Sequence, residues 1–289
     1  MYIVDFCGGL GNQMYQYALF RALQEKGVDA KMSTIHYEHT GDHIPQHGKS
    51  FLLADIFDIK ADYADKKYIY SLGDVSRSVF ARALRKTGYC KKTHKNEIKC
   101  DYPTMEQILS YEKAYLEGYW QNFDYSKQIE DKLRQEFTFK QPLDDKNMQI
   151  SEQIKSCNSV SIHVRRNDYL NVPMYKIQDE NYFIPAVEYI KQNVENPVFF
   201  CFSDDIEWCK NTFKDCNMVF VDWNCGADSY RDMQLMSMCK HNIVANSTFS
   251  VWAAWLNNNP QKIVVRPKRY FNDGYVKRDF AWPCEWIEK

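Results

Sequence analysis

Residues 241–256 read HNIVANSTFSVWAAWL, and this stretch indicates the fold class of the chain. Asn242–Ala245 is a short apolar run of strand length, whereas Ser247–Asn257 has the length and apolar spacing of a helix. Asn246 and Ser247 stand at the junction, where a side-chain oxygen can cap the start of a helix. The stretch therefore predicts a strand that enters a helix through a short polar turn.

The same alternation of strand and helix extends outward from this stretch. It predicts right-handed β–α–β units around a parallel sheet, that is, an α/β fold. The chain also begins with such a unit: strand Tyr2–Phe6, a glycine turn, and a helix over 12–26 that stops at Gly27. Ligands of parallel sheets bind beyond the carboxyl ends of the strands, so the site is expected in those loops. In the second half, strands are expected at 160–164, 198–202, 219–222 and 262–266, and helices at 182–193, 204–213 and 228–240.

The middle of the chain is less regular. A helix is expected around Val75–Arg85, and helical stretches are expected across 105–140, around the segment LEGYWQ at 116–121. The charged, proline-containing segment KQPLDDKN at 140–147 is the best linker candidate. It predicts two domains, 1–145 and 146–289.

Composition excludes several classes of protein. The chain has 289 residues, 37 Lys and Arg against 38 Asp and Glu, and 45% hydrophobic residues, which excludes global disorder and a generally basic nucleic-acid binder. It has no apolar run of about 18 residues and no basic segment ahead of a long apolar one, so neither a spanning helix nor a signal peptide is expected. Ten cysteines without C-x-x-C spacing are then expected to be reduced thiols of a cytoplasmic protein.

Two sequence features suggest ligands but have simpler interpretations. His36, His39, His43 and His47 lie close together, but Gly41 and Pro45 interrupt any helix that would align them, so we expect a polar loop and no metal site. The loop GGLGNQM has Met14 where a dinucleotide fingerprint needs glycine, which disfavours a Rossmann dehydrogenase. This loop either only lets strand and helix pack, or brings backbone and Asn12 close to a ligand.

Charged residues follow the strand SVSIHV. Arg165 and Arg166 at a strand end suit phosphate oxygens, and Asp168 can hold one guanidinium in place. His163 lies two residues before Arg165, so a strand places both side chains on one face. The alternative is a surface Arg–Asp pair with His163 in the core.

Two further strand ends carry candidate residues. Asp204 either complements the dipole of the next helix or accepts bonds from a guanine edge. Asn246–Ser250 either cap a helix or cradle a phosphate with free amide groups. Together these loops predict a site for a nucleoside diphosphate. No two aspartates stand in D-x-D spacing, so a metal-bridged donor site is unsupported and arginine with helix dipoles would neutralise the phosphates.

Four segments, GGLGNQMYQYA, HVRRNDY, FSDDIEWC and HNIVANSTFSVWAAWL, resemble motifs of the α-1,2-fucosyltransferases of glycosyltransferase family 11, and LEGYWQ is similar to another family segment. The motifs run from residue 8 to 256, nearly the whole chain. The resemblance implies a GT-B-like fold of two Rossmann-like lobes, with the donor site in the cleft and mainly on the C-terminal lobe. The first lobe would face the acceptor. The residues after Arg266 are a candidate for a return to the first lobe, as chains of this fold often make.

The resemblance also implies an activity: inverting, metal-independent transfer of L-fucose from GDP-β-L-fucose to the 2-hydroxyl of a β-galactoside, with no cofactor. Asn167 replaces a usual glycine and Val251 a usual tryptophan, and neither change removes a charge. Another GDP-sugar or linkage, a Rossmann-type oxidoreductase and a sugar-binding module remain as alternatives. The implied donor-site residues are Gly9, Leu10, Gly11, Asn12, His163, Arg165, Asp204, Asn246, Ser247, Thr248 and Phe249, and Arg165 and Asp168 are the catalytic candidates.

Three points stay open at this stage. The general base is not assigned, because Asp168, Glu117 and Asp124 all qualify. Trp120 is a candidate platform for a sugar ring. The segment 77–99, with eight Lys or Arg and one acid, is either a solvated face or a contact with an anionic membrane that carries a lipid-linked acceptor.

Overall fold

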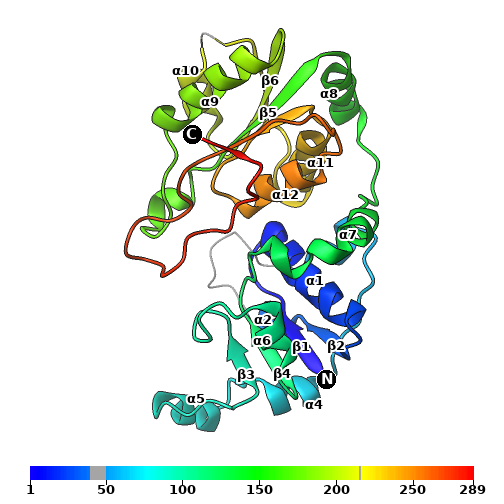
Figure 1. Cartoon of the computed structure of the whole chain (residues 1–289), viewed down its shortest axis with the longest axis vertical. Helices are drawn as coiled ribbons and strands as arrows, with labels where there is room; N and C mark the ends of the chain where they lie inside the picture. Colours follow the sequence, from blue (N-terminus) through cyan, green and yellow to red (C-terminus); the bar gives the residue numbers. More distant parts are fainter. Residues whose placement is uncertain (40–49, 215) are drawn as a thin grey trace. The chain divides into compact units, whose positions relative to one another are not determined.

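The protein consists of two compact α/β units, Met1–Lys140 and Gln141–Lys289 (Figure 1). The structure is a computed structural model that describes residues 1–39, 50–214 and 216–289. The division falls inside the segment KQPLDDKN, slightly ahead of the expected boundary at 145/146. Two parallel-sheet units confirm the predicted fold class of two Rossmann-like lobes.

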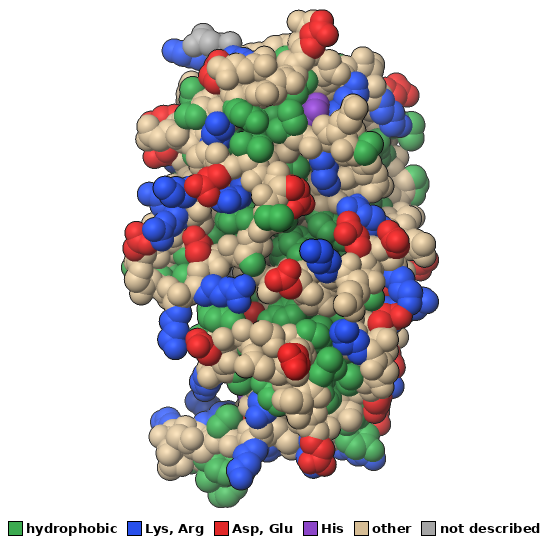
Figure 2. All heavy atoms as spheres, in the orientation of Figure 1, with side chains coloured by type: hydrophobic (Ala, Val, Ile, Leu, Met, Phe, Trp, Pro, Cys, Tyr) green, Lys and Arg blue, Asp and Glu red, His purple; other side chains and the backbone are tan. Residues whose placement is uncertain are grey.

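Charges of both signs are interspersed on the surface. Figure 2 shows Lys and Arg side chains alternating with Asp and Glu over the visible face. This mixture agrees with a formal net charge of −1 for the whole chain. Any functional concentration of charge must therefore be local.

The first unit is built on a four-stranded parallel sheet in the order β2-β1-β4-β3. All four residues of β1 are buried, as expected for a central strand covered on both faces. The strands are β1 (Tyr2–Asp5), β2 (Ala30–Ser33), β3 (His94–Asn96) and β4 (Ala114–Glu117). The helices are α1 (Leu10–Glu25), α2 (Ile35–His39), α3 (Leu53–Ile56), α4 (Lys66–Leu72), α5 (Val79–Lys86), α6 (Met105–Leu109) and α7 (Glu130–Glu136), with 3-10 turns η1 (Phe123–Tyr125) and η2 (Lys127–Ile129).

The predicted opening unit of strand, glycine turn and helix is confirmed by β1 and α1. Helix α1 ends just before Gly27, which has φ +78°, a left-handed conformation that glycine adopts easily at a helix end. A buried ion pair joins this helix to α7, with 2.9 Å between Arg21 Nε and Glu136 Oε2. Tyr17 donates a hydrogen bond to the same carboxylate at 2.8 Å. The buried charge of Glu136 is therefore compensated by both Arg21 and Tyr17.

The helical stretches expected across 105–140 are confirmed by α6, η1, η2 and α7, but the segment LEGYWQ between them is not helical. Leu116 and Glu117 end strand β4, which pairs with β1 on one side and β3 on the other. Gly118 follows at φ +156° and Trp120 at φ +54°, so the chain leaves the strand in a turn that no helix contains. The apolar run AYL is short, and a short apolar run does not by itself distinguish a buried strand from a helix.

The second unit is a six-stranded parallel sheet in the order β10-β9-β8-β5-β6-β7, and it confirms the predicted alternation. The last strand pairs with β9, so the end of the chain belongs to this sheet and not to the first unit. The strands are β5 (Asn158–Val164), β6 (Pro197–Ser203), β7 (Met218–Val221), β8 (His241–Ile243), β9 (Val264–Arg266) and β10 (Ile287–Glu288). The helices are α8 (Asp145–Ser156), α9 (Glu180–Asn193), α10 (Ile206–Thr212), α11 (Tyr230–Met238) and α12 (Thr248–Leu256), with 3-10 turns η3 (Tyr169–Asn171) and η4 (Gly226–Asp228).

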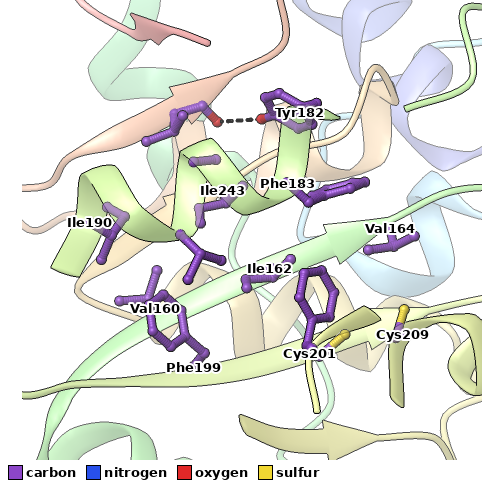
Figure 3. Close-up of a cluster of buried hydrophobic side chains, with 14 of the residues drawn as sticks. Val160, Ile162, Val164, Tyr182, Phe183, Ile190, Phe199, Cys201, Cys209 and Ile243 are labelled. Atoms are coloured by element: carbon purple, nitrogen blue, oxygen red, sulfur yellow. Dashed lines mark hydrogen bonds between the residues drawn. The ribbon is translucent and has the colours of Figure 1, made fainter. Parts of the chain in front are cut away.

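Strand β5 divides its side chains between two faces of the sheet. Val160, Ile162 and Val164 face the apolar side of α9, where Phe183 and Ile190 lie (Figure 3). The alternate residues of the strand point to the opposite face because strand side chains alternate. That opposite face carries Ser159, Ser161 and His163, all buried.

Candidate active site

Three loops meet at one edge of the second sheet because their strands are neighbours. Strand β5 lies between β6 and β8, and the strand order reverses there, since β6 and β7 follow on one side and β8 to β10 on the other. Such a reversal opens a crevice at the carboxyl ends of the strands, where parallel sheets bind ligands. The predicted residues after β5, β6 and β8 all lie at this edge.

Arg165, directly after β5, is held by two carboxylates. Its Nε lies 2.7 Å from Asp168 Oδ1 and 3.3 Å from Asp204 Oδ2. Burial alone would lower the pKa of Arg165, but the hydrogen bond to Asp168 and the charge of Asp204 outweigh burial and raise it. The guanidinium is therefore a positive charge whose orientation is fixed by Asp168 and Asp204.

Arg166 has partners of its own. Its Nε lies 3.1 Å from Asp205 Oδ2, and its guanidinium stacks 4.3 Å from the centre of the Trp208 ring. Its backbone amide donates to Asp204 Oδ1 at 2.9 Å. The two neighbouring arginines therefore have different partners. Arg166 is held against the start of helix α10, whereas Arg165 is held by Asp168 and Asp204.

Asp204 lies between the two arginines. One carboxylate oxygen accepts from the Arg166 amide and the other lies near Arg165, so the side chain links the loops after β5 and β6. Asn167 also donates a hydrogen bond to the Asp204 carbonyl oxygen. The predicted contact of Asp204 with a guanine edge therefore stays a prediction, next to an observed role in orienting Arg165.

His163 is a neutral, enclosed imidazole. Burial, together with the charge of Arg165, lowers the pKa of His163 to about 3. Its ring centre lies 5.6 Å from that of Phe249 in α12, and its Nδ1 has no hydrogen-bond partner among the described residues. A buried polar nitrogen without a partner is rare, and it is commonly paired when a ligand or water is present.

Helix α12 starts at the same edge. Ser247 is its N-cap residue, but the Ser247 side chain accepts no capping hydrogen bond. Thr248 and Phe249 are the first two residues of the helix, and the helix dipole adds a partial positive charge at this end. A helix start of this kind suits a phosphate oxygen.

Asn246, which sequence reasoning placed on the donor, has a structural role. Its side chain is fully buried and its amide donates to the carbonyl oxygens of Lys176 at 2.8 Å and Tyr270 at 2.7 Å. Its own carbonyl oxygen accepts from Tyr169 at 3.2 Å. Asn246 thereby holds three segments around the start of α12.

The first sheet has a glycine loop at its own carboxyl edge. Gly8 has φ +77°, and a Cβ added there would lie 2.6 Å from Asn12 Nδ2, so the turn depends on this glycine rather than on Gly9. Gly9 is the N-cap of α1, and Leu10 and Gly11 are buried in its first turn. The Asn12 side chain accepts from Gln121 Nε2 at 2.9 Å, which joins the loops after β1 and β4.

The turn after β4 is tied down by a buried carboxylate. Glu97 Oε2 accepts from the backbone amides of Tyr119 at 2.9 Å and Trp120 at 2.8 Å. Trp120 is fully buried, so the suggestion that it stacks on a sugar ring was wrong. Tyr119 is 44% exposed and is the aromatic ring of this turn that a ligand can reach.

Sequence reasoning missed two glutamines that build this edge. Gln16 accepts from the Cys7 amide at 3.1 Å and donates to the Gly118 carbonyl oxygen at 2.9 Å. Gln13 accepts from the amides of Leu52 and Leu53. Both side chains are fully buried. The sequence does hold a sign of this role. Two glutamines spaced i, i+3 lie on the helix after a glycine turn, at positions where buried apolar residues would be expected.

An ionisable cluster lies at the same edge of the first sheet. His94 Nδ1 accepts from the Asp74 amide at 2.8 Å, so Nε2 carries the proton and donates to Glu117 Oε2 at 2.6 Å. The hydrogen bond from His94 lowers the pKa of Glu117. Glu117 is half exposed and can meet a sugar hydroxyl, whereas Asp124 lies exposed beyond the turn.

Asp5 gives the stability of the protein a defined pH dependence. Burial is the main cause that raises the pKa of Asp5 to about 7, and the nearby charge of Glu117 adds to it. Between pH 4 and 7 an unfolded Asp5 is ionised while the folded one keeps its proton. Stability therefore falls as pH rises through this interval, by up to about 1.4 kcal/mol per pH unit.

The variant Asp5→Asn should not show this loss. Urea unfolding measures the free energy of unfolding of both proteins at pH 5 and pH 8. Relative to wild type, the variant is expected to be more stable at pH 8 than at pH 5. The same substitution at exposed Asp58 is the control. An unchanged difference at the two pH values would show that Asp5 does not titrate in this range.

The histidine segment 36–47 lies partly outside the described residues. His43 and His47 lie outside the described residues, as does the side chain of His39. Among residues 1–39, 50–214 and 216–289, no three His, Cys, Asp or Glu side chains converge as metal ligands would.

The sequence of this chain is similar to those of known proteins. The chain matches glycosyl transferase family 11 over residues 1–289. It is 33% identical to an alpha-1,2-colitosyltransferase of Escherichia coli, over 99% of this chain and 97% of that one. It is 30% identical to the O-antigen biosynthesis glycosyltransferase WbnK of Escherichia coli, over 91% and 93%. It is 27% identical to human galactoside alpha-(1,2)-fucosyltransferase 1, over 49% and 42%.

The family match makes the chain a glycosyltransferase, and its fixed arginine and helix start lie at the switch point of a parallel sheet. The chain belongs to glycosyl transferase family 11. The resemblance seen in its motifs is thereby confirmed.

Proposed function

We propose that the protein transfers L-fucose from GDP-β-L-fucose to the 2-hydroxyl of a β-galactoside and forms an α-1,2 linkage. One observation carries the proposal: Arg165 is clamped between Asp168 and Asp204 beside the start of α12. The names of two relatives support the linkage, because one is an alpha-1,2-colitosyltransferase and another a galactoside alpha-(1,2)-fucosyltransferase.

The proposed reaction is a single displacement. The acceptor oxygen forms a bond to the anomeric carbon and loses its proton to solvent, while the bond from that carbon to the GDP oxygen breaks, so the configuration inverts. Negative charge grows on the departing β-phosphate. Arg165 and the amide groups at the start of α12 are already oriented, so they stabilise that charge without reorganising. Neutral His163, beside Arg165, would donate or accept one hydrogen bond from its unpaired edge.

Asp168 is assigned to holding Arg165 rather than to removing the acceptor proton. Its carboxylate lies in a 2.7 Å ion pair with the arginine, so the oxygen that would take the acceptor proton is already engaged. In the proposed site the aspartate fixes the direction in which the guanidinium points. Asp204 supports the arginine from the next strand.

Titration calorimetry and a release assay test the function. GDP is expected to bind, and GDP is expected to be released from GDP-fucose only when a galactose-terminated sugar is present. Chelation with EDTA should leave the rate unchanged. Linkage analysis of the product should then find an α-1,2 bond.

The other outcomes point to other functions. No affinity for GDP would contradict a GDP-sugar transferase and favour a sugar-binding module, and nicotinamide binding would favour an oxidoreductase. The donors should be compared directly, because colitose lacks one hydroxyl of fucose and a relative of this chain is named for colitose. A faster reaction with GDP-colitose would replace fucose as the donor sugar.

A further inference from the structure

Helix α5 divides its residues sharply into an apolar and a basic side. At about 100° per residue, Val79, Phe80, Ala83 and Leu84 occupy one continuous arc of the helix. The basic residues of the helix lie on the remaining side. They are Arg82, Arg85 and Lys86.

The apolar side of α5 faces outward. None of the eight residues of the helix is buried, and Val79 is 83% and Phe80 74% exposed. Figure 1 shows α5 lying at the rim of the first unit, beyond β3, and Figure 2 shows green and blue side chains together at that corner. A helix normally packs its apolar stripe against a core, and this one leaves it uncovered.

The helix is nevertheless well anchored in this position. Ser78 caps it by accepting from the Ala81 amide at 3.2 Å. Arg85 donates to the carbonyl oxygens of Asp74 at 3.1 Å and Ser76 at 2.7 Å, which fixes the basic side against the preceding loop. The outward orientation of Val79 and Phe80 follows from these contacts.

The positive charge of the segment 77–99 is not neutralised by ion pairs within the described residues. Five exposed bases form no ion pair within the described part of the chain. The acid of this stretch, Glu97, is buried and bonded to backbone amides. The bases are Arg77, Arg82, Lys86, Lys92 and Lys99.

We propose that this α5 surface (Val79, Phe80, Ala83 and Leu84 with the five bases) binds the headgroups of an anionic membrane and inserts Val79 and Phe80 into the interface. Short helices with an apolar face and basic flanks bind lipid surfaces in this way. Four apolar side chains offer far less than the roughly 800 Å² per partner that a specific protein interface needs. Among the described residues, no helix has the length and apolar character to cross a bilayer.

Membrane binding at α5 does not depend on the proposed transfer reaction. Flotation of the purified protein with vesicles contains no donor or acceptor, so its failure says nothing about catalysis. The vesicles should be protein-free phosphatidylcholine with and without phosphatidylglycerol. The wild type is expected to float with the anionic vesicles, and to float less as the salt concentration rises.

Variants of α5 measure how much its basic and apolar residues contribute to vesicle binding. Arg82→Gln combined with Lys86→Gln should weaken partitioning about 25-fold, since each base near an anionic surface contributes about fivefold. Phe80→Ser should weaken it at least about tenfold through lost apolar burial. The matched controls on α8 are Met148→Ser, an exposed apolar residue, and Lys155→Gln, an exposed base, and both should bind like wild type.

Three results would overturn the proposal. One is a wild type that does not float with anionic vesicles. The other is flotation that the α5 variants and the α8 controls leave equally strong. Binding to native membranes but not to protein-free vesicles would also overturn it, and would point to a protein partner for the α5 surface.

Discussion

Arg165→Ala is expected to lower kcat/KM for the sugar donor roughly 10²–10³-fold. The guanidinium is oriented in advance by Asp168 and Asp204, so under the proposed function its loss removes the charge that stabilises the departing phosphate. Loss of one such donor raises the barrier by about 3–4 kcal/mol in comparable sites. The variant also leaves the carboxylates of Asp168 and Asp204 without their cation, and their negative charge would oppose a bound diphosphate. Initial rates of GDP release measure the effect, and calorimetry separates weaker GDP binding from slower transfer.

Arg166→Ala is the matched control for this prediction. The two arginines are adjacent, but the Arg166 guanidinium is engaged by Asp205 and stacked on Trp208. Its removal should change the rate by less than about tenfold. Equal losses in the two variants, or wild-type turnover by Arg165→Ala, would refute the assignment. Circular dichroism and thermal unfolding confirm that both variants fold.

Gly118→Ala is expected to destabilise the first unit by about 3 kcal/mol and to lower the transfer rate with it. The backbone at Gly118 has φ +156°, and an added Cβ would lie 2.5 Å from Glu97 Cβ and 2.7 Å from Glu97 Oε2. Relief of that overlap must move Glu97, which accepts from the Tyr119 and Trp120 amides. A buried carboxylate and two amides would then lose their partners, and unpaired buried groups are costly.

Urea unfolding measures this destabilisation, and Gly88→Ala isolates its steric part. Gly88 also has a left-handed backbone, with φ +84°, but nothing lies within 4 Å of the Cβ that alanine would add. Gly88→Ala should therefore lose only the backbone preference, about 1 kcal/mol. Similar losses of unfolding free energy in both variants would contradict this prediction, because the overlap with Glu97 would then add no cost.

The fold of the second unit could be predicted because most of its strands are central in a parallel sheet. A strand covered on both faces is a continuous apolar run, and runs such as VFFCFS are short and bounded by polar turns. The first unit was harder to predict. Its strand β4 contributes only Ala114–Glu117, and its continuation into an aromatic turn looked helical.

The candidate site was predictable as a set of residue types but not as a set of contacts. His163, Arg165, Asp204 and Ser247 were identified from the ends of their strands. Nothing in the local pattern shows that Asp204 holds Arg165, or that the Asn246 amide is used up on the Lys176 and Tyr270 carbonyls. The exposure of Trp120 was misjudged for the same reason, because burial depends on segments distant in the chain.

Local pattern therefore specifies the elements, the glycine turn and the charged residues at each strand end, since these follow from side-chain periodicity and backbone freedom within a few residues. The order of strands is decided only by packing of the whole unit. That order places β5 between β6 and β8, so residues roughly 40 and 80 positions apart share one edge. Packing also leaves the apolar side of α5 uncovered, a feature that periodicity alone would assign to the core.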